Sequence, residues 1–513
     1  MMNHQISPVE NEVSVIDFGS QYTQLIVRRV RELGFLAHLY QPEELPLLNK
    51  PGAIILSGGP KSTHDEDAID IDFAALQGYG VPVLGVCYGM QLLNLKFGGS
   101  VSRSEHREYG PAQLVPKGDS PLYQGVKDSQ VWMSHSDTVE NLSETTQVIA
   151  TNKDGIPVSL SWGHDFYGIQ FHPEVTHSHQ GTLILKNFLN LAPELKPFKI
   201  NDFKEELLEK IRKDVGGREV VCGVSGGVDS TVLAVLLKEA GVNMRAIFVD
   251  HGLLRKNESA EVQSYFKKIG INLQVLEVSE LFLGKLAGVS DPEVKRKIIG
   301  NLFLDVFWDA VGGEVELLAQ GTLYPDVIES ASNKNSKAST IKTHHNRISR
   351  VLELQEQGKV LEPLDQLFKD EVRELGMLLG IDADIVNRHP FPGPGLAVRC
   401  PGAITPEKLH SIREADAIFI GKLKEHGWYD KVWQACVTLI DSKTVGVKGD
   451  ERSYENPVSL RAVISEDAMT ADWVELPYEL IREVSNLILN KVPGVNRVLY
   501  DVSTKPPASI EWE

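Results

Sequence analysis

The sequence predicts an α/β protein with two doubly wound domains, each built on a mostly parallel sheet, followed by a smaller α+β domain. Two observations predict this fold class. Short apolar runs alternate with amphipathic stretches over most of the chain, which is the pattern of βαβ units. The length of 513 residues also exceeds what one hydrophobic core usually serves, so several domains are expected.

The first block runs from Val13 to about Leu191. Its expected strands include VSVIDFG, GAIILSGG and VPVLGVC, and its expected helices include QYTQLIVRRVRELG and GMQLLNLKFGG. Proline and charge then cluster in LAPELKPFKINDF, residues 191–203. We interpret this segment as a linker.

The second block repeats the same rhythm and ends near HPFPGPG, residues 389–395. Its expected strands are EVVCGVSGG, MRAIFVDHG, NLQVLEV and VELLAQGT, with a helix at STVLAVLLKEAG. The remaining residues mix strand patterns such as VSLRAVI with one expected helix, YELIREVSNLILNKV. The expected organisation is a flexible N-terminus at 1–12 and domains at 13–195, 200–388 and 389–513.

Composition limits the classes of partner. Hydrophobic residues at 42% and charged residues at 24% are ordinary for a soluble globular protein. A net charge of −18 argues against binding to nucleic acid or an anionic membrane, although a local basic pocket can still hold an anion. The four cysteines show no CxxC spacing, so neither a zinc cluster nor a disulfide framework is expected. No signal peptide pattern and no apolar run of membrane-spanning length is present, so we expect a cytoplasmic protein with small-molecule partners.

Cys87 lies between two glycines in GVCYG, residues 85–89, directly after an expected strand. This spacing is typical of a nucleophile elbow, in which a strand turns sharply into a helix and the central residue is held in a strained conformation. The N-terminus of the following helix favours a thiolate over a thiol. The alternative is a buried core cysteine, which is the more common situation for a lone cysteine after an apolar strand.

Two further motifs favour the nucleophile. FHPEVTH offers His172 as the base that activates Cys87, with Glu174 orienting the imidazole. SGGP, residues 57–60, offers glycine N–H groups to a developing oxyanion. HPE alone is a weak signal and is equally compatible with a surface turn.

Together these motifs resemble the class I glutamine amidotransferases over residues 13–191. The resemblance implies that Cys87, His172 and Glu174 hydrolyse the side-chain amide of glutamine through a thioester and release ammonia. It also implies an oxyanion hole formed by the backbone N–H groups of Gly59 and Tyr88. The implied glutamine pocket consists of Gln91, Ser134, His135, Ser136 and Asp137.

SGGVDS, residues 225–230, lies between an expected strand and an expected helix. A glycine-rich turn at a helix N-terminus is a phosphate cradle, because free N–H groups and the helix dipole converge there. The loop is not a Walker A motif, since it lacks the lysine of GxxxxGK[ST]. A purely structural glycine turn is the alternative.

The complete SGGVDS resembles the signature of the N-type ATP pyrophosphatases, which split ATP between the α- and β-phosphates and adenylate a substrate oxygen. The resemblance implies a Mg²⁺ contact at Asp229 and an adenine contact at Val249. It further implies that residues 319–330, 341–346 and 362–376 wall the nucleotide site. The implied ATP-binding residues are Ser225, Gly226, Gly227, Val228, Asp229, Ser230 and Val249.

The order of these blocks and the ending KPPASIEWE resemble the glutamine-hydrolysing GMP synthases, a family of carbon–nitrogen ligases, over the whole chain. The resemblance implies that xanthosine monophosphate (XMP), ATP, glutamine and water give GMP, AMP, pyrophosphate and glutamate, the final step of GMP synthesis. It implies a homodimer formed through the C-terminal domain. The implied XMP contacts are Arg255, Asp450, Lys505 and Glu511.

Two other interpretations remain open at the level of the sequence. The same modules could serve another amidating or thiolating pyrophosphatase that acts on a nicotinate adenylate, an amino acid or tRNA. Alternatively, the chain could be a regulatory protein that only binds nucleotide and glutamine. The intact Cys–His–Glu set and the intact SGGVDS loop argue against the regulator, because binding alone does not require them.

Overall fold

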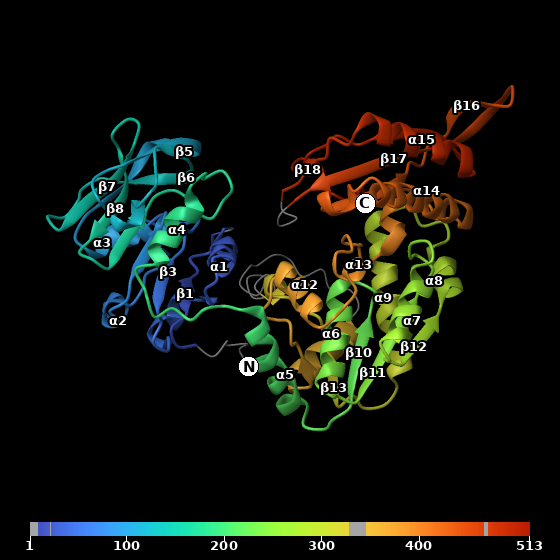
Figure 1. Cartoon of the computed structure of the whole chain (residues 1–513), viewed down its shortest axis with the longest axis horizontal. Helices are drawn as coiled ribbons and strands as arrows, with labels where there is room; N and C mark the ends of the chain where they lie inside the picture. Colours follow the sequence, from blue (N-terminus) through green and yellow to red (C-terminus); the bar gives the residue numbers. More distant parts are fainter. Residues whose placement is uncertain (1–8, 21, 328–344, 466–469) are drawn as a thin grey trace. The chain divides into compact units, whose positions relative to one another are not determined.

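The computed structural model describes residues 9–20, 22–327, 345–465 and 470–513. The chain divides into two compact units, Met1–Phe203 and Lys204–Glu513 (Figure 1). The N-terminal residues of the first unit that are described already belong to the fold, because Glu12 is buried and accepts a hydrogen bond from His38 at 2.5 Å. Residues 1–8 of the expected flexible N-terminus lie outside the described residues.

The first unit is built around one mixed sheet. Strands β2, β1, β3, β4 and β9 are parallel neighbours, and the remaining strands extend the sheet in antiparallel fashion. Across the sheet the described strands are β2 (Ala37–Tyr40), β1 (Val13–Ile16), β3 (Ala53–Leu56), β4 (Val83–Val86), β9 (Phe166–Ile169), β8 (Pro157–Trp162), β7 (Thr146–Asn152), β5 (Val101–Pro116) and β6 (Ser129–Val139). The helices are α1 (Thr23–Glu32), α2 (Phe73–Gly78), α3 (Tyr88–Lys96) and α4 (Gly181–Leu189), with 3-10 turns η1 (Pro42–Leu47) and η2 (Pro121–Tyr123).

The central strands of this unit are apolar throughout. Every residue of β1, β3 and β4 is buried, as expected for parallel strands that are covered on both faces. The carboxyl end of β4 leads directly into α3. The predicted cysteine therefore lies at the edge of the sheet where ligands bind in doubly wound folds.

The second unit begins with an all-parallel sheet. Its strands, in order across the sheet, are β12 (Leu273–Glu277), β11 (Met244–Asp250), β10 (Val220–Val224), β13 (Leu317–Ala319) and β14 (Val360–Leu361). The helices are α5 (Ile200–Val215), α6 (Val228–Glu239), α7 (Glu258–Lys268), α8 (Ser279–Leu286), α9 (Pro292–Val311), α11 (His345–Glu356), α12 (Lys369–Leu378) and α13 (Ala383–Val386). α6 follows β10, so the predicted phosphate loop lies at a strand-to-helix turn in the middle of the sheet.

A smaller α+β part completes the second unit. Its strands are β15 (Gln434–Leu439), β16 (Thr444–Lys448), β17 (Glu451–Ile464), β18 (Asp472–Trp473) and β19 (Val495–Tyr500), antiparallel except for the β17–β19 pair. Helices α14 (Pro406–Glu425) and α15 (Tyr478–Lys491) accompany them, with 3-10 turns η3 (Gly395–Arg399) and η4 (Tyr429–Lys431). One hydrophobic cluster joins Leu253 and Phe282 to Leu396 and Val437, so the packing is continuous across residue 389.

The predicted fold class is confirmed: a parallel-dominated sheet, an all-parallel sheet and a small α+β part follow one another along the chain. Among the described residues, no helix is long and apolar enough to cross a membrane.

Candidate active sites

Cys87 lies between the last residue of β4 and the first residue of α3, as predicted. Its φ of 51° is a strained conformation for a non-glycine residue. The flanking glycines are required by space, because a Cβ on Gly85 would lie 2.5 Å from the carbonyl carbon of Gly89, and a Cβ on Gly89 would lie 2.4 Å from the carbonyl oxygen of Leu56. The side chain of Cys87 is 5% exposed, yet it lines a cavity rather than the core alone.

His172 and Glu174 form a buried pair. The Nδ1 atom of His172 lies 2.7 Å from Oε1 of Glu174, and both side chains are at most 3% exposed. Burial would lower the pKa of the His172 imidazole, but the charge of Glu174 and the hydrogen bonds to Cys87 and Glu174 raise it well above the ordinary value. The geometry therefore favours an imidazolium next to the sulfur.

Gly58 lies next to both the histidine and the cysteine. A Cβ on Gly58 would lie 3.1 Å from Cε1 of His172 and 3.6 Å from Cβ of Cys87. The SGGP loop thus reaches the reacting atoms, where a larger residue than glycine would be crowded.

One cavity of about 350 Å³ brings the predicted glutaminase residues together. Glu174 contacts His172 but does not itself line the cavity. His135 is buried in the cavity lining, and burial lowers the pKa of its imidazole despite the neighbouring charge of Glu108. The lining includes Cys87, His172, Gly59, Tyr88, Gln91, Ser134, His135, Ser136 and Asp137.

Gln170 is a site residue that the sequence reasoning missed. Its Nε2 atom donates a hydrogen bond to Sγ of Cys87 at 3.5 Å, and its Oε1 accepts one from Gln91 at 3.3 Å. Gln91 also donates to the backbone oxygen of Asp137 at 3.0 Å, so the predicted pocket residue reaches the sulfur through Gln170. The available signal was its place directly before FHPEVTH, two residues before His172.

The SGGVDS loop turns from β10 into α6, as predicted. Gly226 has a φ of +78°, and a Cβ there would lie 2.7 Å from Cγ2 of Val262. The hydroxyl of Ser230 accepts a hydrogen bond from the N–H of Ser225 at 3.1 Å, which ties the two ends of the loop together. Val249 is buried in the neighbouring strand β11.

Two cations that the sequence reasoning did not single out lie against this loop. Nη1 of Arg388 donates to the carbonyl oxygen of Gly226 at 2.9 Å and lies 3.2 Å from Glu258. Lys369 forms an ion pair with Asp229. Lys369 begins α12, within the predicted wall segment 362–376, whereas nothing local marks Arg388 as part of the site.

The other two predicted wall segments are only partly described. Residues 328–330 of the segment 319–330 and residues 341–344 of the segment 341–346 lie outside the described residues. The segment 362–376, which carries α12, is the fully described one. The N–H of Phe368 donates a hydrogen bond to Glu371 at 2.8 Å at the start of this helix.

A cavity of about 410 Å³ extends from Gly226 in the loop to Arg255, one of the predicted XMP contacts. Glu511, a second predicted contact, lies on the same unit and pairs with Arg399 through both carboxylate oxygens, at 2.9 and 3.0 Å. Burial would raise the pKa of the Glu511 carboxyl group, but the charge and hydrogen bonds of Arg399 hold it below its ordinary value. The backbone of Lys505, the third contact, exchanges hydrogen bonds with Ala471.

Asp450, the fourth predicted contact, lies in another part of the C-terminal sheet. It lies in the exposed turn between β16 and β17, before Glu451. Gln434, which donates a hydrogen bond to Glu511, pairs with Val463 near the opposite end of β17. Twelve residues of extended strand span roughly 40 Å. Within one chain, Asp450 and Glu511 therefore lie near opposite ends of β17, and a contact of Asp450 with XMP stays a prediction.

The chain matches three family models. Residues 14–192 match the class-I glutamine amidotransferases, residues 200–289 match the PP-loop domain, and residues 421–512 match the GMP synthase C terminal domain.

Curated relatives match from end to end. A GMP synthase (glutamine-hydrolyzing) of Thermosipho africanus is 51% identical over 98% of this chain and 100% of its own. Proteins of the same name from Chlorobaculum tepidum and Flavobacterium psychrophilum are each 49% identical over 98% of this chain and 99% and 100% of their own. The chain belongs to the GMP synthase family.

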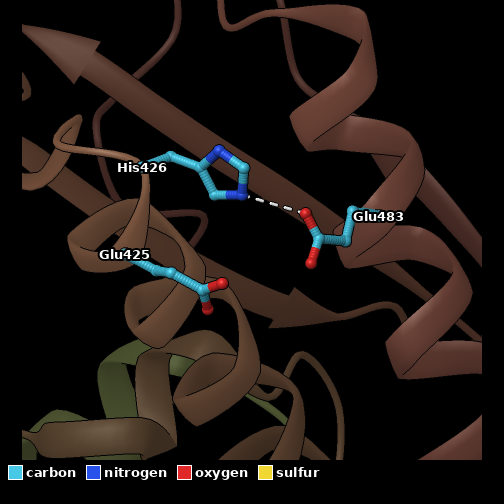
Figure 2. A group of neighbouring side chains, drawn as sticks. All are labelled: Glu425, His426 and Glu483. Carbon is cyan, nitrogen blue, oxygen red and sulfur yellow. Dashed lines mark hydrogen bonds and ion pairs between the residues drawn. The ribbon is translucent and has the colours of Figure 1, made fainter.

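One further cluster of side chains contains two carboxylates and an imidazole, which are groups that can bind metal ions. Side-chain atoms of Glu425 at the end of α14, of His426 directly after it and of Glu483 in α15 lie within 4.8 Å of one another (Figure 2). Nζ of Lys422, however, lies 2.7 Å from Glu425 and 2.6 Å from Glu483. Because one ammonium group already pairs with both carboxylates, we interpret the cluster as a surface ion-pair network.

Proposed function

We propose that this chain converts XMP to GMP with glutamine as the nitrogen donor and ATP as the activating co-substrate, giving AMP, pyrophosphate and glutamate. The observation that carries the proposal is the presence of both sites on one chain of the GMP synthase family: the Cys–His–Glu arrangement and the SGGVDS loop. The enzyme is a ligase that forms a carbon–nitrogen bond.

The glutaminase half-reaction begins at Cys87. We expect its sulfur to attack the side-chain amide carbon of glutamine while the N–H groups of Gly59 and Tyr88 face the oxyanion. The His172 imidazolium then gives its proton to the leaving ammonia, which leaves a thioester on Cys87. A water molecule, deprotonated by His172, hydrolyses the thioester to glutamate. The 2.7 Å pair with Glu174 supports this role, because it fixes the imidazole and stabilises its charged form.

The synthase half-reaction requires activation of the purine. Oxygen at C2 is a poor leaving group, so its attack on the α-phosphorus of ATP, with loss of pyrophosphate, creates an AMP ester that ammonia displaces. No protein nucleophile is needed, only positioning and neutralisation of charge. The loop residues 225–230 would hold the pyrophosphate portion, and Val249 the adenine. Arg388 supports this arrangement by holding the loop through the carbonyl oxygen of Gly226.

Mg²⁺ is the metal that ATP chemistry of this kind uses. Asp229 fits a contact to it, because Oδ1 of Asp229 is buried and has no hydrogen-bond partner among the described residues. A carboxylate oxygen is the ligand type that Mg²⁺ prefers. Bound there with ATP, the ion would neutralise the charge of the departing pyrophosphate, while Lys369 balances the carboxylate.

XMP would bind next to the ATP loop, with Arg255, Lys505 and Glu511 as its contacts. The cavity of about 410 Å³ that joins Gly226 to Arg255 supports this position, since the nucleotide oxygen must reach ATP. Arg255 and Arg388, two basic residues of different segments, both line this cavity, which suits a phosphate-bearing ligand.

We propose a homodimer that forms through the C-terminal part, and a cytoplasmic location. The hairpin of β16 and β17 exposes Val445, Val447 and Tyr454, which are 54%, 74% and 61% exposed, as expected of an apolar interface. The four cysteines are all free, which fits a reducing compartment.

An assay with XMP, ATP, Mg²⁺ and glutamine tests the function. We expect GMP, AMP and pyrophosphate in equal amounts, and glutamate in at least that amount, measured by chromatography. A control that lacks XMP should yield no GMP. If XMP, ATP and either glutamine or ammonium give no GMP, the proposed function is wrong.

A further inference from the structure

Two arginines from different parts of the second unit lie at one aromatic ring. The guanidinium carbon of Arg255, after β11, lies 4.9 Å from the ring centre of Phe391, and that of Arg399, at the end of η3, lies 5.1 Å from it. Arg399 is fully buried. Two like charges held this close away from water repel each other unless a counter-charge lies near both.

Asp416 of helix α14 supplies that counter-charge. Its Oδ2 lies 3.3 Å from Nε of Arg255, and its Oδ1 lies 3.8 Å from Nη1 of Arg399. The side chain is 4% exposed, so water screens these contacts little. Nε of Arg255, Nη1 of Arg399 and Oδ1 of Asp416 are buried and make no hydrogen bond to any described residue. The carboxylate therefore acts on both arginines through its charge.

The network continues into the C-terminal tail. Arg399 holds both carboxylate oxygens of Glu511, and Gln434 donates a further hydrogen bond to the same carboxylate at 2.5 Å. Arg255 reaches the strand that carries Gln434 by donating to the carbonyl oxygen of Ala435 at 3.5 Å. One continuous series of contacts thus runs from Arg255 through Asp416 and Arg399 to Glu511.

We propose that Asp416 is a positioning residue for the XMP step: it holds Arg255 and, through Arg399, Glu511 in the relative placement that the nucleotide requires. The inference rests on the proposed function, since Arg255 and Glu511 are its expected XMP contacts. The Asp416 side chain is 4% exposed, so its charge acts on the two arginines rather than on ions at the protein surface. Removal of its charge leaves the two guanidinium groups with Glu511 as the single remaining carboxylate partner, so we expect Arg255 to lose its orientation.

Helix α14 also offers a matched control. Glu414, two residues before Asp416, pairs with Lys256 at 2.7 Å, and Lys256 directly follows Arg255. This pair joins the same two segments, but its side chains are 26% and 43% exposed. Exposed ion pairs contribute little, whereas removal of one partner of a buried pair leaves an uncompensated charge.

The experiment compares Asp416→Asn with Glu414→Gln in the full chain. GMP formation is measured with ammonium as the nitrogen donor, so that glutamine hydrolysis is bypassed. We expect Asp416→Asn to raise KM for XMP by about tenfold or more, with a much smaller change in KM for ATP, and to leave glutaminase activity intact. Glu414→Gln should match the wild type in all three measurements.

Arg399→Lys provides a second route if Asp416→Asn does not fold. It keeps the charge but loses the bidentate hydrogen bonding to Glu511, so we expect the same selective rise in KM for XMP. Unchanged KM for XMP, or equal increases in KM for XMP and ATP, in the folded variants would overturn the inference. A wild-type chain that makes no GMP under the same conditions would instead refute the proposed function and, with it, this role for Asp416.

Discussion

The glutaminase site and the synthase site differ in what holds them together. Cys87, His172 and Glu174 are fixed by two short motifs, with glycines that admit no Cβ and a hydrogen bond between residues two positions apart. In the synthase site, the loop 225–230, Arg255 and the tail are each held by an ion pair between residues more than 100 positions apart. The first site is therefore preformed by local backbone geometry, whereas the second depends on long-range charge networks.

The replacement Cys87→Ala should have the largest effect and should separate the two sites most clearly. Without the sulfur no thioester forms, so we expect complete loss of glutamine-dependent GMP formation. Ammonium-dependent formation at alkaline pH, where free ammonia is available, should stay close to that of the wild type. The measurement is GMP production with each nitrogen donor. If glutamine still supports the reaction, Cys87 is not the nucleophile.

Glu174→Gln tests how far the histidine depends on its partner. We expect the glutaminase kcat to fall by about 10²- to 10⁴-fold, because the imidazole loses the charge that orients it and stabilises its protonated form. Since Glu174 raises the pKa of His172, its removal lowers that pKa, and the limb of the pH–rate profile that His172 controls should move to lower pH. An unshifted profile from a folded variant would contradict this account.

Gln170→Leu tests the residue that the motifs did not reveal. Loss of the Nε2 donor to Sγ should reduce glutaminase activity by about 10- to 100-fold, the usual value of one hydrogen bond to a charged group. Ammonium-dependent synthesis serves as the internal control and should not change. Activity equal to that of the wild type would mean that the 3.5 Å contact has no catalytic role.

The sequence predicted the features that local geometry creates. The elbow at Cys87, the pairing of His172 with Glu174 and the turn at Gly226 each arise within a few residues, so a motif can indicate them. Arg388, Lys369 and Asp416 reach the synthase site only through tertiary contacts, and their local sequence resembles an ordinary solvated helix or loop. The expected XMP contact of Asp450 stays a prediction, because a residue list carries no distances and a long strand separates this aspartate from Glu511 within one chain.

Gly226→Ala should give the smallest effect. It tests the one part of the synthase site that, like the glutaminase site, is set by backbone geometry. At a φ of +78° alanine is strained by about 1 kcal/mol, and its Cβ would lie 2.7 Å from a methyl group of Val262. Since a side chain yields more easily than the backbone atoms that surround Gly85 and Gly89, we expect a folded enzyme with KM for ATP raised by roughly tenfold.

Val262→Ala combined with Gly226→Ala separates the two causes. Removal of the methyl contact should recover part of the ATP affinity, and the remainder measures the backbone strain alone, read from KM for ATP in the single and double variants. A double variant no better than Gly226→Ala would mean that conformation, not space, demands glycine there. The phosphate loop would then be as locally determined as the elbow at Cys87, and only the XMP contacts would depend on the long-range network.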